Sequence, residues 1–180
     1  NFILMNHLIS SFKILIIYVL LITNIYAKEN IVYVDMDAII NTSKAGLSIN
    51  NQIKKLIDQN NKDYEKLEKS LVKEENDLLK KKNVTDPQKF NEEIKNFQNK
   101  IKDFRSKRQK SVENIQGKNI KAKQELVTHI TKILAEYSTK NEISLILNKE
   151  SIVIGKKDIE ITEKILELLN KKIKTIKLKS

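Results

Sequence analysis

The sequence contains no cysteine, and its 180 residues include only one proline and three glycines. Without cysteine the chain has neither a disulfide framework nor thiolate chemistry. The glycines, Gly46, Gly117 and Gly155, are far apart in the sequence and form no phosphate-binding loop. The fold must therefore be stabilised by burial and by assembly alone.

The scarcity of proline and glycine is most marked in the middle of the chain. Between Ile49 and Tyr137 the only proline is Pro87 and the only glycine is Gly117. A long polar stretch without regular breakers that carries periodic apolar residues is typical of helices. Before Pro87, and again after it, apolar residues recur in steps of four and three: first Ile53, Ile57, Tyr64, Leu67, Leu71 and Leu78, a row interrupted at Asn60 and Glu74, then Phe90, Ile94, Phe97, Ile101 and Phe104.

A short lysine-rich break separates the two helical patterns. After residues 80–82, which are all lysine, either Asp86 or Thr85 can cap the second helix, and Pro87 suits its first turn. A sharp stop followed at once by a new start predicts an antiparallel helical hairpin of the coiled-coil type with a basic tip.

The two predicted arms differ in length. The first arm spans about residues 47–82 and the second about residues 87–140, so the second must continue past the start of the first into a body. We assign residues 47–137 to this hairpin, or tentacle. The predicted body comprises residues 28–46 and 138–180.

The body is expected to contain three short strands. Residues 31–36 are rich in β-branched and aromatic side chains and predict a strand, which is followed by a helical turn and a polar connector at 41–46. Residues 143–147 and 151–155 predict the two strands of a β-hairpin.

A closing amphipathic helix begins at Asp158 or Thr162, and residues 175–180 are expected to fray. Three strands and one helix give a small core and leave strand edges exposed, so we expect a homo-oligomer. The predicted fold class is α+β, mostly α, in which a long antiparallel helical hairpin projects from a small β body.

The first 27 residues have the pattern of a secretory signal peptide. Lys13 precedes an uncharged apolar run at 14–22, and Ile25-Tyr26-Ala27 follows it. This predicts cleavage after Ala27 and export, with an uncleaved membrane anchor as the alternative. Met5 is a candidate start residue.

The formal net charge is +11, and all but two of the 34 basic residues are lysine. Such a charge suggests an anionic partner: nucleic acid, a lipid surface or an acidic polypeptide. Codon bias toward lysine is the alternative explanation. Nucleic acid is not expected as a partner, because its readers use arginine and stacking aromatics and this chain carries an export signal.

No set of residues predicts catalysis, a metal or a cofactor. His129 has no second histidine or cysteine nearby, and an ordinary helical position accounts for it. Asp35 and Asp37 lie two residues apart and could be paired carboxylates, but the junction of a strand with a helix is a common place for aspartate. We therefore expect a protein that is not an enzyme.

The aromatic row on the arms is the most informative feature. It can simply be a seam between the two helices, or parts of it can line a cavity shared between subunits, where weak apolar contacts and surrounding lysines hold an unfolded, acidic client. The candidate client or cavity residues are Tyr64, Leu71, Phe90, Phe97 and Phe104. The candidate basic residues of the tip and surface are Lys80, Lys81, Lys82, Arg105, Lys107 and Arg108, although a solvated helix face is the simpler interpretation of the last three.

The order of these features resembles the Skp (OmpH) family of periplasmic chaperones for outer-membrane proteins. The resemblance is carried by the strand at 31–36 after a signal peptide, the charged hairpin with Glu125-Leu126-Val127-Thr128 on its return arm, the segment 143–147, and the closing helix at 158–172. It extends over nearly the whole mature chain. No single motif is specific to the family, but the order of the elements is.

This resemblance implies a periplasmic homotrimer with a small β-barrel body and three helical tentacles around a cavity. Such proteins hold unfolded outer-membrane β-barrel precursors without ATP, and their basic tips meet anionic lipid or lipopolysaccharide. The sequence has no clear counterpart of a defined lipopolysaccharide-binding cluster. The alternatives are a structural coiled-coil protein of the envelope and a basic protein that binds lipopolysaccharide or nucleic acid.

Overall fold

The computed structural model describes residues 30–179, so the predicted signal peptide lies outside the described residues. This part of the chain is mostly helical and contains one two-stranded sheet. None of its helices combines the length and the apolarity needed to cross a membrane. In chain order the elements are β1 (Ile31–Val34), α2 (Met36–Thr42), α3 (Lys44–Lys81), α4 (Pro87–Lys140), β2 (Leu145–Asn148), the 3₁₀ turns η1 (Lys149–Ser151) and η2 (Lys157–Ile159), and α5 (Thr162–Lys172).

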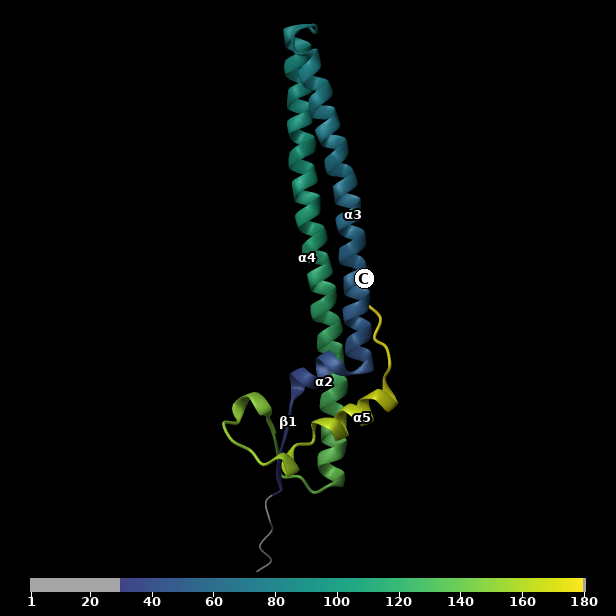
Figure 1. Cartoon of the computed structure of the whole chain (residues 1–180), viewed down its shortest axis with the longest axis vertical. Helices are drawn as coiled ribbons and strands as arrows, with labels where there is room; N and C mark the ends of the chain where they lie inside the picture. The colour runs from purple at the N-terminus through teal and green to yellow at the C-terminus, as the bar shows by residue number, and fades with distance from the viewer. Residues whose placement is uncertain (1–29, 180) are drawn as a thin grey trace, which may run out of the picture. The chain divides into compact units, whose positions relative to one another are not determined.

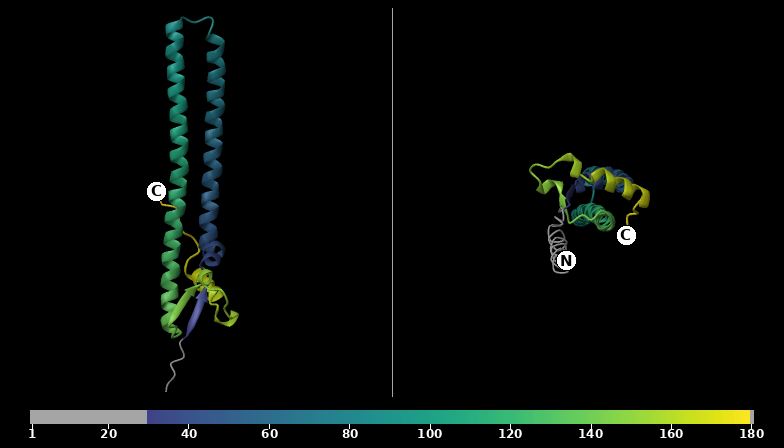
Figure 2. Two further views of the ribbon diagram at one scale, coloured as in Figure 1. Left: turned by 90° about the vertical axis from the view of Figure 1, so that its left-hand side faces the viewer. Right: turned by 90° about the horizontal axis from the view of Figure 1, so that it is seen from below.

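The two long helices, α3 and α4, lie side by side and run antiparallel, which confirms the predicted helical hairpin (Figure 1 and Figure 2). Helix α4 begins at Pro87 because the Asp86 side chain accepts hydrogen bonds from the backbone N–H groups of Gln88 and Lys89. With 38 and 54 residues, the helices are about 57 Å and about 81 Å long at the helical rise. The longer α4 therefore continues past the start of α3, as predicted.

The polar connector predicted at 41–46 is wrong, because only Ser43 separates α2 from α3. Ser43 is fully buried, and its Oγ accepts a hydrogen bond of 3.1 Å from the Gly46 N–H, which starts α3 earlier than the sequence suggested. Gly46 is required for packing, since a Cβ atom there would lie 1.8 Å from the Ile40 carbonyl oxygen. The glycine that suggested a loop thus allows α3 to pass close to α2.

The sheet pairs β1 with β2 in parallel, from Ile31 opposite Leu145 to Val34 opposite Asn148. The predicted β-hairpin of 143–147 with 151–155 is therefore wrong. The first of these segments contributes instead to β2, which pairs with β1. The chain then turns through η1 and leaves the second without a partner strand among the described residues.

One apolar cluster, which we call the base core, joins the helices near the sheet. It forms where α2, α3, α4 and α5 meet, and residues of β1 also contribute to it. The large side chains that are essentially inaccessible to solvent at its centre are Ile39, Ile49, Leu126, Ile130, Ile165 and Leu169. Because they come from four helices, this cluster fixes the lower ends of both arms relative to α2 and α5.

The segment after α5, residues 173–179, runs back along the lower part of the arms, and we call it the C-terminal strap (Figure 1). The Ile176 side chain is only 3% exposed, and its carbonyl accepts a hydrogen bond of 2.8 Å from Gln52 Nε2 of α3. Lys179 Nζ lies 2.6 Å from a carboxylate oxygen of Glu125 on α4. The prediction that this end frays is therefore wrong, because its apolar side chains are buried against the arms.

Replacing Ile176 with alanine should lower the free energy of unfolding by about 2–5 kcal/mol, because it leaves a cavity in the base core. Urea unfolding at one fixed protein concentration measures the change. The exposed neighbour Lys177, replaced with alanine, is the matched control and should stay within about 0.5 kcal/mol of the wild type. Equal stability of the two variants would contradict a buried strap.

Candidate functional site

Toward the tip, the seam between the arms is formed by side chains of the predicted apolar row. Tyr64 of α3 and Phe104 of α4 meet edge to face, with ring centroids 5.7 Å apart. Phe97 is buried and Leu71 is half-buried in the same seam. Phe90 is also half-buried, but it lies nearer the tip and lines neither of the hollows described next.

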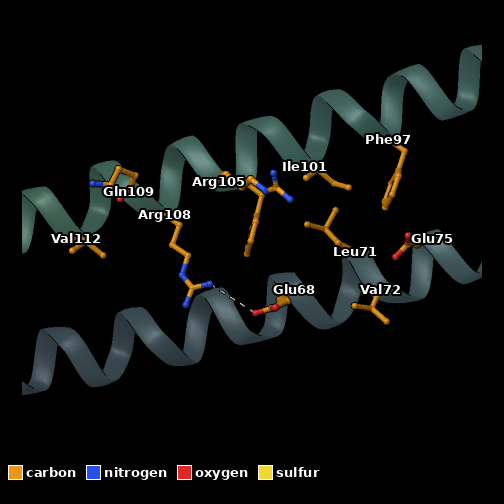
Figure 3. A pocket seen from close by; sticks show the side chains of 11 residues that line it. Glu68, Leu71, Val72, Glu75, Phe97, Ile101, Arg105, Arg108, Gln109 and Val112 are labelled. Atoms are coloured by element: carbon orange, nitrogen blue, oxygen red, sulfur yellow. Dashed lines mark ion pairs between the residues drawn. The ribbon is translucent and has the colours of Figure 1, made fainter.

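On one side of this seam the arms form an open hollow of about 430 Å³, which we call the arginine-side hollow (Figure 3). Its apolar lining comprises Leu71, Phe97, Ile101 and Phe104, with the more exposed Val72 and Val112 at the rim. Its charged lining comprises Glu68, Glu75, Arg105 and Arg108. Figure 3 shows Phe97 and Leu71 pointing toward the facing helix and Arg108 reaching toward Glu68.

A second hollow, of about 320 Å³, lies on the other side of the seam, and we call it the lysine-side hollow. It shares Leu71 and Phe104 with the first. Its remaining lining is mainly polar and comprises Tyr64, Leu67, Ser70, Glu74, Lys100, Asp103 and Lys107. A helix turns about 100° per residue, so neighbours such as Leu67 and Val72 fall on opposite sides of Leu71.

The predicted basic residues are distributed over three places. Lys80, Lys81 and Lys82 are exposed at the tip, where Lys80 pairs with Asp77 at 3.4 Å and Lys81 pairs with Glu93 at 3.2 Å. Arg105 and Arg108 line the arginine-side hollow, whereas Lys107 lines the lysine-side hollow. The structure therefore does not bring these six residues together into one basic patch.

Sequence reasoning missed Val72, one of the two rim residues of the arginine-side hollow. Val72 does not belong to the heptad row, because it lies beside Leu71 on α3. A second apolar residue directly next to a row residue, as in Leu71-Val72, was the available signal. It widens the apolar stripe on one side of the seam only.

Between the hollows and the base core, polar groups join the arms. Ser111 of α4 donates a hydrogen bond to Asn60 of α3. Nearby, Gly117 faces open space, since a Cβ atom there would meet nothing within 4 Å. Helix α4 runs through Gly117 without interruption, so this glycine is tolerated and does not end the helix.

Asp35 and Asp37, which the sequence suggested as paired carboxylates, have different structural positions. Asp35 is the N-cap of α2, and the Ala38 N–H donates to its Oδ1 at 2.8 Å, which lowers the pKa of the Asp35 carboxyl. Asp37 is exposed in the first turn of α2. It lies beside Glu150 and raises the pKa of the Glu150 carboxyl.

Lys149 links Asp35 to the segment that precedes α5. Its Nζ lies 3.2 Å from a Glu160 oxygen and 3.3 Å from an Asp35 oxygen, and these contacts raise the pKa of Lys149. The Thr162 hydroxyl donates to Glu160 at 2.9 Å and thereby lowers the pKa of that carboxyl. These side chains bind one another, so they hold the turn after β2 in place and do not form a catalytic site.

Residues 30–179 contain no group of histidine, cysteine, aspartate and glutamate side chains suited to hold a metal ion. His129 is half-buried on α4, one helical turn from Glu125, whose carboxylate pairs with Lys179. It lies close to the C-terminal strap and lines neither hollow.

The family model of OmpH-like outer membrane proteins matches residues 30–169. The chain therefore belongs to the OmpH/Skp family of outer-membrane-protein chaperones, which is a family of chaperones and not of enzymes. No curated protein matches the sequence.

The structure is also similar to the crystal structure of a chain from Caulobacter crescentus CB15, described as an OmpH-like candidate outer membrane chaperone, with a TM-score of 0.78. The two sequences are 18% identical, and the match covers 84% of this chain and 89% of the other. At this identity the likeness shows the shared fold.

The charged group around Lys149 predicts a loss of stability in acid. The pKa values of the Asp35 and Glu160 carboxyls are lower in the folded protein than in the unfolded chain, where they are about 3.9 and about 4.3. The ionised carboxylates therefore stabilise the fold at a pH above these unfolded values. This stabilisation is lost as the pH falls through the lower folded pKa values. An Asp35→Asn variant keeps a capping side chain but loses the charge. Its urea midpoint should be below that of the wild type at pH 7.

As the pH falls from 5 toward 3, the difference between the two proteins should narrow, because the wild type alone loses the Asp35 contribution. Asp58→Asn, an exposed change on α3, is the control and should follow the wild type. A constant gap between Asp35→Asn and the wild type over this range would contradict the assigned role of the carboxylate.

Proposed function

We propose that this chain is an ATP-independent periplasmic holdase that binds unfolded outer-membrane β-barrel proteins and prevents their aggregation. The observation that carries the proposal is the pair of arms, α3 and α4, which extend far beyond the base core and carry open, partly apolar hollows along their seam. Family membership supports the same function. No cofactor or nucleotide is part of it.

Client contact would involve Tyr64, Leu71, Phe90, Phe97 and Phe104 together. Because several of these side chains pack against the facing arm, each offers a client only part of its surface. Many weak contacts of this kind favour promiscuous binding over a close fit. The loss of any one of these side chains should therefore leave client binding largely intact.

The active form would be a homotrimer, in which 28–46 and 138–180 form the body and 47–137 forms the tentacle. The support for self-assembly is exposed apolar surface near an open strand edge. Val153 and Ile154 are 97% and 91% exposed, and β2 has a free edge in the two-stranded sheet. Exposed apolar groups beside an unpaired edge are typical of surfaces that pair with another chain.

The tip would contact anionic lipid or lipopolysaccharide. Besides the lysines at 80–82, it exposes Leu79 and Val84, the latter at 83%. Apolar side chains among lysines favour an anionic membrane surface. Export by a signal peptide at 1–27 would place the protein in the periplasm, where such surfaces and unfolded barrels occur.

The light-scattering mass of residues 28–180 should be that of a trimer. Mixed with a urea-unfolded outer-membrane barrel that is diluted into buffer, the trimer should form a discrete soluble complex with one client. A dimer or a long polymer that leaves the client to aggregate would contradict the proposal and favour a structural coiled-coil protein of the envelope.

A Val153→Asp change should lower the mass toward that of a monomer, because it places a charge in the proposed contact between copies. Val84→Asp is the matched control, since the same change is made at an equally open valine on the tip. If both variants remain trimers, the loop at 152–155 is not part of the interface between copies.

A further inference from the structure

Both arginines of the chain lie on the same hollow. Of the 34 basic residues only Arg105 and Arg108 are arginine, and both line the arginine-side hollow, whose lining contains no lysine. The lysine-side hollow, formed by the same two helices, has Lys100 and Lys107 as its cations. The two sides of one seam therefore differ in the chemistry of their positive charge.

The two hollows also differ in how firmly charges join the arms across them. On the lysine side, Lys100 Nζ of α4 lies 2.5 Å from Glu74 of α3, so each of these two groups already has a close partner on the facing arm. On the arginine side, the only such pair within the described chain is Arg108 Nη1 with Glu68 at 4.0 Å (Figure 3). An exposed pair at that distance contributes little and exchanges readily for another carboxylate.

Arg105 adds a cation that is free for a ligand. No carboxylate in residues 30–179 forms an ion pair with it, and it lies next to the apolar lining of Ile101 and Phe104. A guanidinium group is planar, weakly hydrated and able to bind a carboxylate through two hydrogen bonds or to stack on an aromatic ring. A lysine ammonium group is a strongly hydrated point charge and offers neither.

We propose that the arginine-side hollow is the face on which each tentacle holds an unfolded client, and that its occupant is an extended polypeptide segment with an aromatic or branched apolar side chain next to a carboxylate. The proposal rests on the proposed holdase function and specifies its contact surface. The apolar side chain lies against Leu71, Phe97 and Phe104, between the exposed Val72 and Val112. The carboxylate binds Arg105 and displaces Glu68 from Arg108.

The remaining charges of the hollow favour a peptide over a lipid phosphate. Glu68 and Glu75 line the same hollow, so its formal charge is balanced. A balanced hollow has no excess of positive charge to hold a phosphate group, whereas a client side chain next to a carboxylate gains both the apolar lining and a guanidinium group. The apolar lining also suits a side chain, because the exposed Val72 and Val112 flank a hollow that Phe97 and Phe104 also line.

Site-specific photocrosslinking tests which face is occupied. A photoreactive phenylalanine analogue is placed at Val72 or at Leu67, which are 52% and 50% exposed on the same helix but line opposite hollows. The probes are a urea-unfolded outer-membrane barrel and a short synthetic peptide with phenylalanine between two aspartates. We expect several-fold more crosslinking to both probes from Val72 than from Leu67.

Equal or stronger crosslinking from Leu67 would overturn the assignment of the face. So would a soluble complex with the barrel in which neither position crosslinks, although the holdase function would then stand. Crosslinking of the peptide from Val72 without any soluble barrel complex would keep the site and overturn the holdase function. Preferred crosslinking of Val72 to vesicles that contain anionic phospholipid would overturn the peptide as occupant.

Charge-conserving variants separate arginine chemistry from net charge. The double change Arg105→Lys with Arg108→Lys should weaken binding of the aspartate-flanked peptide by about three- to tenfold, as expected for the loss of charge-assisted hydrogen bonds, measured by fluorescence anisotropy. Lys102→Gln, at an exposed position of α4 that lines neither hollow, removes a charge and should change the affinity less. If Lys102→Gln has the larger effect, net charge alone attracts the peptide and the site assignment fails.

Discussion

The rest of the structure depends on burial at the base core. Two helices of this length carry too narrow an apolar stripe to be held together along their whole seam, and without cysteine no covalent link can help them. Ile49, Leu126 and Ile130 are instead buried against α2 and α5, so the lower third of the hairpin is anchored by a core built from four helices. The C-terminal strap adds Ile176 to this core.

From the base core toward the tip, the seam between α3 and α4 is first polar and then partly apolar. The hydrogen bond between Ser111 and Asn60 replaces hydrophobic contact, and farther out the ring pair of Tyr64 and Phe104 joins the arms while leaving hollows on both sides. Most apolar side chains of the upper arms are only partly buried. The two arms alone are therefore held together weakly, and some apolar surface stays exposed to solvent. In the proposed holdase, stability and client binding therefore belong to different ends of the same two helices.

The sequence was sufficient for the hairpin, because period, breakers and caps are local signals: Pro87 and a capping residue just before it predict the start of α4, and the structure shows that the cap is Asp86. The sequence was insufficient wherever the conformation of a segment depends on contact with residues far away or on another element. Residues 151–155 have the composition of a strand but find no neighbouring strand within residues 30–179, and Gly46 resembles a loop residue although it is needed for contact with Ile40. In the candidate site, the sequence predicted the aromatic row. It did not predict the arginine-side hollow, because that hollow depends on how the surfaces of α3 and α4 pack against each other.

Hydrogen–deuterium exchange of the chain, alone and with an unfolded outer-membrane barrel bound, tests the central claim most directly. The account predicts slower exchange on the facing segments 68–75 and 101–112 when the client is present, with little change at the base core around Leu126 and Ile130. Protection confined to the body or to the strap, with the arms unchanged, would contradict the assignment of client binding to the upper arms.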